Sequence, residues 1–166
     1  MEKVSINKTI NLSEHITLGE VTKSKYAEIY NIPSHVAIEN LKRVCVWLEE
    51  LRFTYNLLYC LKPGEDYETS ENIEPIVINS GYRSPQLNKK VGGSPTSNHL
   101  TGCAVDIRVY GIEQAMRYAV ILMDYADETK QDYDELLIER NRSGGYWLHF
   151  AVRPKDNRRK TMFIQK

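Results

Sequence analysis

Apolar residues recur every three or four positions in the segment that follows Ser34 and ends near residue 59. This spacing places them on one face of an α-helix over residues 35–59, and the Ser34 hydroxyl can cap its first turn. The stripe consists of Ile38, Leu41, Val44, Leu48 and Leu51. A second helix is predicted over residues 112–126, and a short one over residues 24–30.

Three later segments show a different period, in which every second residue is apolar, as in strands with one buried face. These segments are residues 104–109, 135–139 and 146–152, and a glycine-containing turn joins the last two as a hairpin. A short apolar run at residues 76–78 predicts a further strand. Helices that precede and interrupt such strands indicate an α+β fold, with a small antiparallel sheet and helices packed on one side.

The length of 166 residues is enough for one domain, residues 1–166, with its own buried core. Within it we expect residues 1–33 to form a lead-in and residues 153–166 a solvated basic tail. The 22 basic and 22 acidic residues balance, so no overall field attracts nucleic acid or an anionic membrane. No stretch approaches the roughly 18 apolar residues of a membrane span.

Two of the four histidines occupy positions that suggest a metal site. His99 precedes Asp106 in one segment, and His149 follows far downstream in a predicted strand. Two imidazoles and one carboxylate, with a fourth position open to water, are a ligand set of catalytic zinc. Taken singly, a histidine is more often a surface residue, and an aspartate on a polar strand face is usually just solvated. The three cysteines include no Cys-x-x-Cys pair, which argues against a thiolate site.

Strand alternation tests the metal hypothesis, because side chains two residues apart share a face. The predicted core face carries Val105, Ile107, Val109, Leu136, Ile138, Leu148, Phe150 and Val152. Asp106, His149 and Glu139 then project together from the opposite face. Glu135 shares that face but lies about 13 Å further along its strand, at about 3.3 Å per residue.

Further runs of residues surround these candidate ligands. They include Ser80-Gly81-Tyr82-Arg83-Ser84-Pro85, Ser97-x-His99-x-x-Gly102-x-Ala104-x-Asp106-Ile107 and Trp147-x-His149. With these runs the chain resembles the zinc D-alanyl-D-alanine carboxypeptidases and the related phage endolysin peptidases. Those enzymes belong to the hedgehog/D-Ala-D-Ala peptidase fold group. The resemblance covers roughly residues 11–152 and is densest over residues 80–107.

The resemblance implies one zinc ion per chain, with the ligands His99, Asp106 and His149. It also implies a role for Arg83 in holding the substrate's carboxylate or polarising the scissile carbonyl, both of which suit a guanidinium. A structural salt bridge is the alternative role for Arg83. The counterpart serine, Ser97, either bonds the substrate backbone or orients the His99 loop.

Two aromatic residues are candidates for the walls of the cleft. Tyr82 lies in the Ser-Gly-Tyr-Arg run and Trp147 in the Trp-x-His run. Core packing is an equal alternative for either ring.

The general base is assigned from the resemblance. The family's catalytic acid lies shortly before the last histidine, in a stretch like Asp-x-Leu-Ile-x-Glu. Residues 134–139 fit this pattern, with Glu139 as the counterpart. The turn over residues 140–145 departs from the pattern and could shift the register, so Glu135 stays open as the base.

The implied reaction is hydrolysis of a peptidoglycan stem peptide by activated water, as a carboxypeptidase or an endopeptidase, and we expect a monomer. One alternative is a catalytically silent zinc module that binds a partner or a cell-wall peptide. The other is a serine or cysteine hydrolase that uses Ser80, Ser84 or Cys103, although no Gly-x-Ser-x-Gly elbow is present.

The first 14 residues are polar and lack the apolar core of a secretory signal. Two locations are therefore expected. The chain either accumulates in the cytoplasm and acts at the cell wall, as phage enzymes do, or is exported and its signal removed.

Overall fold

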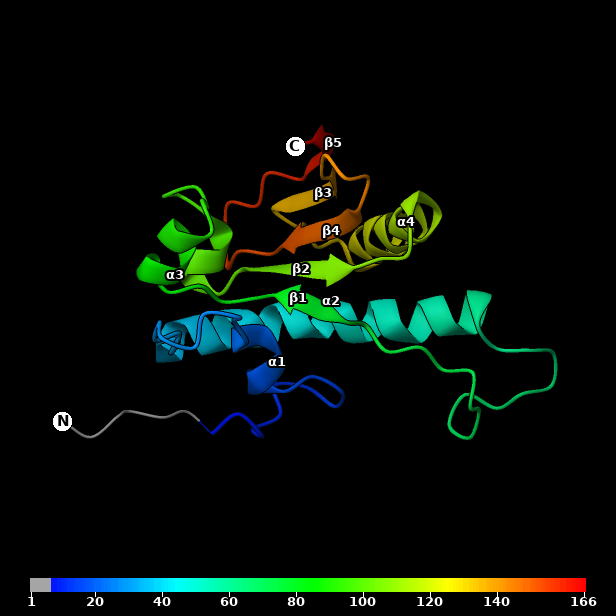
Figure 1. Cartoon of the computed structure of the whole chain (residues 1–166). Helices are drawn as coiled ribbons and strands as arrows, with labels where there is room; N and C mark the ends of the chain where they lie inside the picture. The colour runs from blue at the N-terminus through cyan, green and yellow to red at the C-terminus, as the bar shows by residue number, and fades with distance from the viewer. Residues whose placement is uncertain (1–6) are drawn as a thin grey trace.

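The computed structural model describes residues 7–166 and has the predicted α+β architecture (Figure 1). Its helices are α1 (Leu18–Thr22), α2 (His35–Tyr59), α3 (Pro85–Lys90) and α4 (Ile112–Thr129), with a 3₁₀ turn, η1 (Asn98–Thr101). Its strands are β1 (Ile78–Ser80), β2 (Ala104–Arg108), β3 (Glu135–Arg140), β4 (Tyr146–Ala151) and β5 (Lys160–Gln165). None of the helices within residues 7–166 is long and apolar enough to cross a membrane.

The long helix α2 has the predicted bounds and supplies much of the core. The Ser34 hydroxyl accepts a hydrogen bond from the Ala37 backbone amide at 3.2 Å, which satisfies an amide that the first turn leaves free. Four residues of the predicted stripe are fully buried, namely Leu41, Val44, Leu48 and Leu51. The Trp47 ring lies 5.5 Å from that of Phe150, so α2 packs against the core face of the sheet.

The strands form one mixed sheet in the order β1-β2-β4-β3-β5. The first four strands pair antiparallel, but β5 runs parallel to β3. The predicted strands therefore pair antiparallel as expected, and β5, a strand that was not predicted, adds a parallel pairing at one edge. Strand β4 ends where β3 begins, and the connection over residues 152–159 stays at that end. Strand β5 consequently starts beside the start of β3 and runs in the same direction.

The segment predicted as a solvated basic tail is largely exposed, and it is also ordered against the sheet. Residues 160–165 form β5, and two arginines of the preceding connection bind one buried carboxylate. The Arg158 guanidinium donates to Asp134 Oδ2 at 2.7 Å, and Arg153 donates to Oδ1 of the same side chain. The basic residues thus neutralise an internal acid as well as facing water.

The lead-in contains a helix, but not where it was predicted. Residues 24–30 form turns, and the helix is α1, which begins after Thr17. Thr17 and Glu20 form a capping box, in which each side chain accepts from the other's backbone amide. The Thr-x-x-Glu spacing is a sequence signal that could have located this helix, and the prediction did not use it. Residues 1–6 of the predicted lead-in lie outside the described residues.

The two faces of the sheet differ as the alternation predicted. Val105, Ile107, Leu148 and Phe150 are fully buried toward the helices. Residues of the other face line a cleft instead. Asp106 and His149 are direct partners across the β2–β4 ladder, so the pairing register alone brings these two side chains together.

Candidate metal centre and basic cleft

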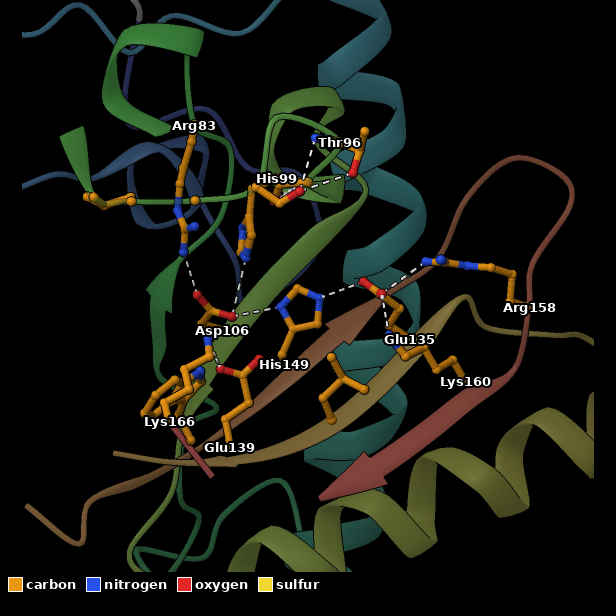
Figure 2. A pocket seen from close by; sticks show the side chains of 17 residues that line it. Arg83, Thr96, His99, Asp106, Glu135, Glu139, His149, Arg158, Lys160 and Lys166 are labelled. Carbon is orange, nitrogen blue, oxygen red and sulfur yellow. Dashed lines mark hydrogen bonds and ion pairs between the residues drawn. The ribbon is translucent and has the colours of Figure 1, made fainter. Parts of the chain in front are cut away.

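The three predicted metal ligands converge at one point (Figure 2). One ligating atom of His99, one of Asp106 and one of His149 lie within 4.8 Å of one another. Asp106 Oδ1 is 3.3 Å from His99 Nε2 and 2.9 Å from His149 Nδ1. Turn η1 supplies His99, β2 supplies Asp106 and β4 supplies His149. We call these three residues the metal cluster.

A close backbone approach fixes the turn that carries His99. Gly102 ends η1 with a φ of 74°, and a Cβ at this position would lie 2.4 Å from the Ala37 carbonyl oxygen in α2. Only glycine fits both the conformation and the space. At the start of the turn, the Ser97 hydroxyl accepts from the His99 backbone amide at 3.3 Å. Ser97 therefore helps to orient the His99 loop, and it also lines the cleft, so a substrate contact stays open.

The ring of His99 is oriented by the backbone. Its Nδ1 lies 2.6 Å from the Gly81 carbonyl oxygen. A carbonyl can only accept, so Nδ1 carries a hydrogen, and Nε2 is the ring nitrogen that faces Asp106 and the metal cluster. His99 is 2% exposed, which keeps bulk water from competing for this hydrogen bond.

The ring of His149 lies between two carboxylates. Its Nδ1 faces Asp106, and its Nε2 lies 3.1 Å from Glu135 Oε2. Burial alone would lower the pKa of His149, but the hydrogen bonds to Asp106 and Glu135 raise it to about 9. The hydrogen bond from His149 in turn lowers the pKa of Glu135 to about 2.

The Asp106 carboxylate uses its two oxygens differently. Oδ1 faces the histidines, whereas Oδ2 accepts from Arg83 Nη2 at 2.6 Å. Burial favours the neutral acid, but His99 and His149 together bring the pKa of Asp106 well below its ordinary value. Arg83 Nε also donates to the Ser80 hydroxyl at 2.9 Å. Arg83 thus forms a structural salt bridge with Asp106, which was the alternative role expected for it. It also lines the cleft, as a role in substrate binding requires.

The metal cluster lies in a cleft of about 540 Å³. Residues 91–97 form one wall, and β3, β4 and residues near β5 form the other. Four basic side chains line it, namely Arg83, Arg158, Lys160 and Lys166 (Figure 2). Trp147 lines the cleft as expected, whereas Tyr82 is 8% exposed and packs in the hydrophobic core. The expectation that Tyr82 walls the cleft is therefore corrected in favour of core packing.

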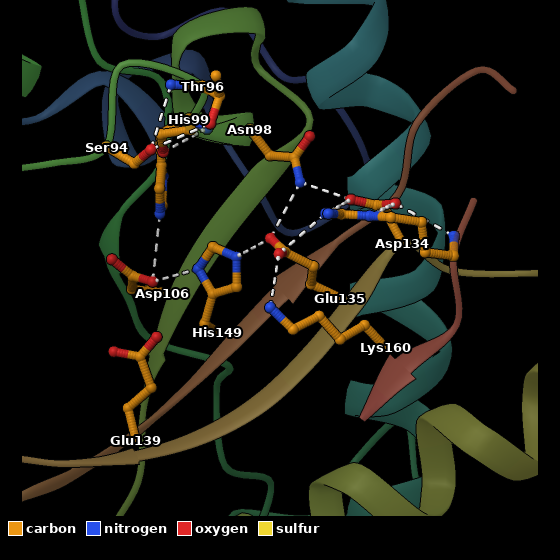
Figure 3. A network of polar contacts seen from close by, with 12 residues as sticks. Ser94, Thr96, Asn98, His99, Asp106, Asp134, Glu135, Glu139, His149 and Lys160 are labelled. Atoms are coloured by element: carbon orange, nitrogen blue, oxygen red, sulfur yellow. Dashed lines mark hydrogen bonds and ion pairs between the residues drawn. The ribbon is translucent and has the colours of Figure 1, made fainter. Parts of the chain in front are cut away.

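Two glutamates flank His149 on the same face of the sheet. His149 pairs with Leu137 of β3, so Glu135 and Glu139 are its two diagonal neighbours. Glu139 lines the cleft and points toward Asp106 and His149 (Figure 3), and its carboxylate forms an ion pair with Lys166. Glu135 faces the outer nitrogen of the imidazole instead. Lys166 could not be predicted as a partner of Glu139, because β5 has no clear pattern of apolar residues that would predict a strand.

The candidate nucleophiles of a serine or cysteine hydrolase make other contacts in this structure. The Ser80 hydroxyl accepts from Arg83, and the Ser84 hydroxyl accepts from the Leu87 amide at the start of α3. Cys103 is buried, and burial raises the pKa of its thiol. These positions do not favour a serine or cysteine nucleophile.

Comparison with known families agrees with this geometry. Residues 65–131 match the model of the Peptidase M15 family. This confirms the resemblance, and the segment includes Arg83, His99 and Asp106, while Glu139 and His149 follow it along the chain. No curated protein matches the chain.

The donor set fits the zinc ion on which M15 peptidases depend. Two imidazole nitrogens and one carboxylate are available, and each histidine has its other nitrogen hydrogen-bonded. Zinc-binding histidines almost always show this second hydrogen bond, because it fixes the tautomer and the ring orientation. The cleft beside the cluster leaves room for water and substrate, as a catalytic site requires.

Proposed function

We propose that the chain is a zinc-dependent peptidase that cleaves peptidoglycan stem peptides, as a carboxypeptidase or an endopeptidase. The observation that carries this proposal is the metal cluster, which opens into a basic cleft beside Glu139. The proposal includes one zinc ion per monomeric chain. It also includes action at the cell wall, reached either from the cytoplasm or by export.

The metal cluster, Glu139 and Arg83 have separate roles in the proposed amide hydrolysis. A zinc ion held by His99, Asp106 and His149 would activate water for attack on the amide carbonyl. Glu139 accepts the proton of the attacking water and passes it to the leaving amine. The Arg83 guanidinium donates hydrogen bonds to the developing oxyanion or to a substrate carboxylate. No covalent bond to the protein forms in this scheme.

The charge of the cleft supports an anionic peptide as the substrate. Four basic side chains line the cleft, against the three carboxylates of Asp106, Glu135 and Glu139. A bound divalent cation would add two further positive charges. Stem peptides carry free carboxylates, so the cleft attracts them and holds them by charge-assisted hydrogen bonds.

One observation favours the silent zinc module as a second candidate. The ion pair with Lys166 occupies the carboxylate that the hydrolytic scheme uses as its base. A module that only binds a cell-wall peptide would keep the zinc ligands and the basic cleft and would not need Glu139.

Incubation with muropeptides separates the two candidates. The purified protein, loaded with zinc, is incubated with them, and the products are analysed by mass spectrometry. We expect a mass loss that identifies the bond cut, and no loss with the zinc-free protein. Zinc-loaded protein that binds muropeptides and leaves them intact would show that the chain is the silent module.

A further inference from the structure

Four side chains bind the Glu135 carboxylate, which lies outside the metal cluster (Figure 3). Its Oε2 lies 3.1 Å from His149 Nε2 and accepts from Asn98 Nδ2 at 3.0 Å. Its Oε1 lies 2.9 Å from Arg158 Nη2 and 3.9 Å from Lys160 Nζ. The Glu135 side chain is 15% exposed, whereas that of Arg158 is 51% exposed and reaches water.

The contact with His149 determines which ring nitrogen faces the metal cluster. A carboxylate accepts hydrogen bonds, so the Nε2 of His149 is held as a donor and Nδ1 is directed toward Asp106. We propose that Glu135 is a positioning residue that sets the tautomer and orientation of His149 for metal binding. The inference rests on the proposed function insofar as that function requires a metal at this cluster.

Glu135 is itself held by a buried anchor. The Asp134 side chain is fully buried and accepts from Asn98 Nδ2 at 2.7 Å and from Arg158 Nη2 at 2.7 Å. The same two groups also bind Glu135. Asn98 immediately precedes His99 in η1. A single polar network therefore connects the turn that carries one histidine ligand to the carboxylate that orients the other.

The same contacts distinguish Glu135 from the proposed base. Both of its oxygens accept hydrogen bonds or ion pairs from protein groups. It also contacts the imidazole nitrogen that points away from Asp106. Glu135 therefore acts on the reaction through His149, whereas Glu139 forms an ion pair with Lys166 and faces the cleft.

Zinc affinity tests the inference independently of turnover. It is measured at one fixed pH by competition with a chromophoric chelator. Glu135→Leu removes the acceptor and is expected to weaken zinc binding 10- to 100-fold, the usual cost of losing such a partner. Glu135→Gln keeps an amide oxygen as acceptor, so its loss is expected to be several-fold smaller. The matched control is Glu139→Gln, which removes one negative charge from the same strand and cleft and should leave zinc affinity within about 3-fold.

A spectroscopic readout separates positioning from a general loss of structure. Nitrogen-15 NMR of the zinc-loaded protein should show His149 protonated at Nε2, and this signal should be altered in Glu135→Leu but kept in Glu135→Gln. Unchanged zinc affinity and an unchanged His149 signal in both variants would overturn the inference while leaving the peptidase proposal intact. Wild-type protein that binds no zinc would instead overturn the proposed function.

Discussion

The two histidines of the metal cluster are oriented by different means. The outer nitrogen of His99 donates to the Gly81 carbonyl, whereas that of His149 faces the Glu135 side chain. A main-chain acceptor is set by the path of the backbone, and no substitution of a side chain at that position removes it. A side-chain acceptor depends on one residue and on the groups that hold it. The orientation of the His99 ring is therefore fixed by the backbone, whereas that of the His149 ring can be changed by substituting side chains.

The packing around each histidine reinforces this contrast. On the His99 side, a Cβ at Gly81 would lie 2.3 Å from the Val21 carbonyl oxygen, and one at Gly102 would meet α2. Close backbone contacts therefore hold this side in place. On the His149 side, polar side chains do the same work, through Glu135, Asn98 and Arg158. Disruption of the backbone contacts around His99 should lower the free energy of unfolding. Disruption of the polar contacts around His149 should lower the affinity for the metal.

The largest expected effect is common to both sides. His99→Ala and His149→Ala each remove a ligand, so each should cost more zinc affinity than the roughly 100-fold that follows the loss of an outer partner. Peptide cleavage should fall to background in both variants. Zinc content by elemental analysis and muropeptide cleavage by mass spectrometry check this. Cleavage that persists in His99→Ala would exclude the metal mechanism.

The next effect sharpens the difference between the two glutamates beside His149. Glu139→Gln should lower kcat about 100- to 10,000-fold, because the amide cannot accept the proton of the attacking water. Zinc affinity should be kept, since Glu139 lies outside the metal cluster and forms its ion pair with Lys166. Single-turnover kinetics together with zinc titration provide the measurement. Full turnover in this variant would transfer the role of base to another residue.

A glycine substitution tests whether close backbone contacts hold the turn that carries His99 in place. Gly102→Ala places a Cβ against the Ala37 carbonyl in a left-handed conformation, and should lower the free energy of unfolding by about 3 kcal/mol. Gly92 is the matched control, with a φ of 72° and no atom within 4 Å of an added Cβ. Gly92→Ala meets only the backbone strain and should cost about 1 kcal/mol. Urea unfolding of both variants compares them, and equal costs would show that the contact with α2 is unimportant.

The contrast also explains which parts of the molecule could be predicted from sequence. The stripe of α2 and the alternation in β2 and β4 are strong local signals, and they correctly placed Asp106 and His149 on the face away from the core. These signals arise because burial acts on every turn of a helix and on every second residue of a strand.

The parts that escaped prediction depend on contacts between distant segments. Strand β5 pairs at the edge of the sheet, where its largely exposed side chains leave no clear alternation. The position of β5 places Lys166 beside Glu139, and no local sequence pattern predicts this ion pair. Glu135 could have been found, because the β3–β4 register makes it a diagonal neighbour of His149. The direction of the imidazole ring, which decides its role, required the structure.

The smallest expected effect concerns the anchor of the His149 side. Asp134 is fully buried, and although burial disfavours its charge, hydrogen bonds from Arg158, Asn98 and Arg153 lower the pKa of its carboxyl below the ordinary value. Asp134→Asn should therefore lower the free energy of unfolding at pH 7 by about 2 kcal/mol, a discounted value because both arginines reach water. A group with a lowered pKa stabilises the fold above its unfolded pKa of about 3.9 and loses this contribution as pH falls. The difference between wild type and variant should thus be constant from pH 7 to about pH 5 and shrink below about pH 4. Urea unfolding across this range measures it, and a difference that does not change with pH would show that the Asp134 charge does not stabilise the network behind His149.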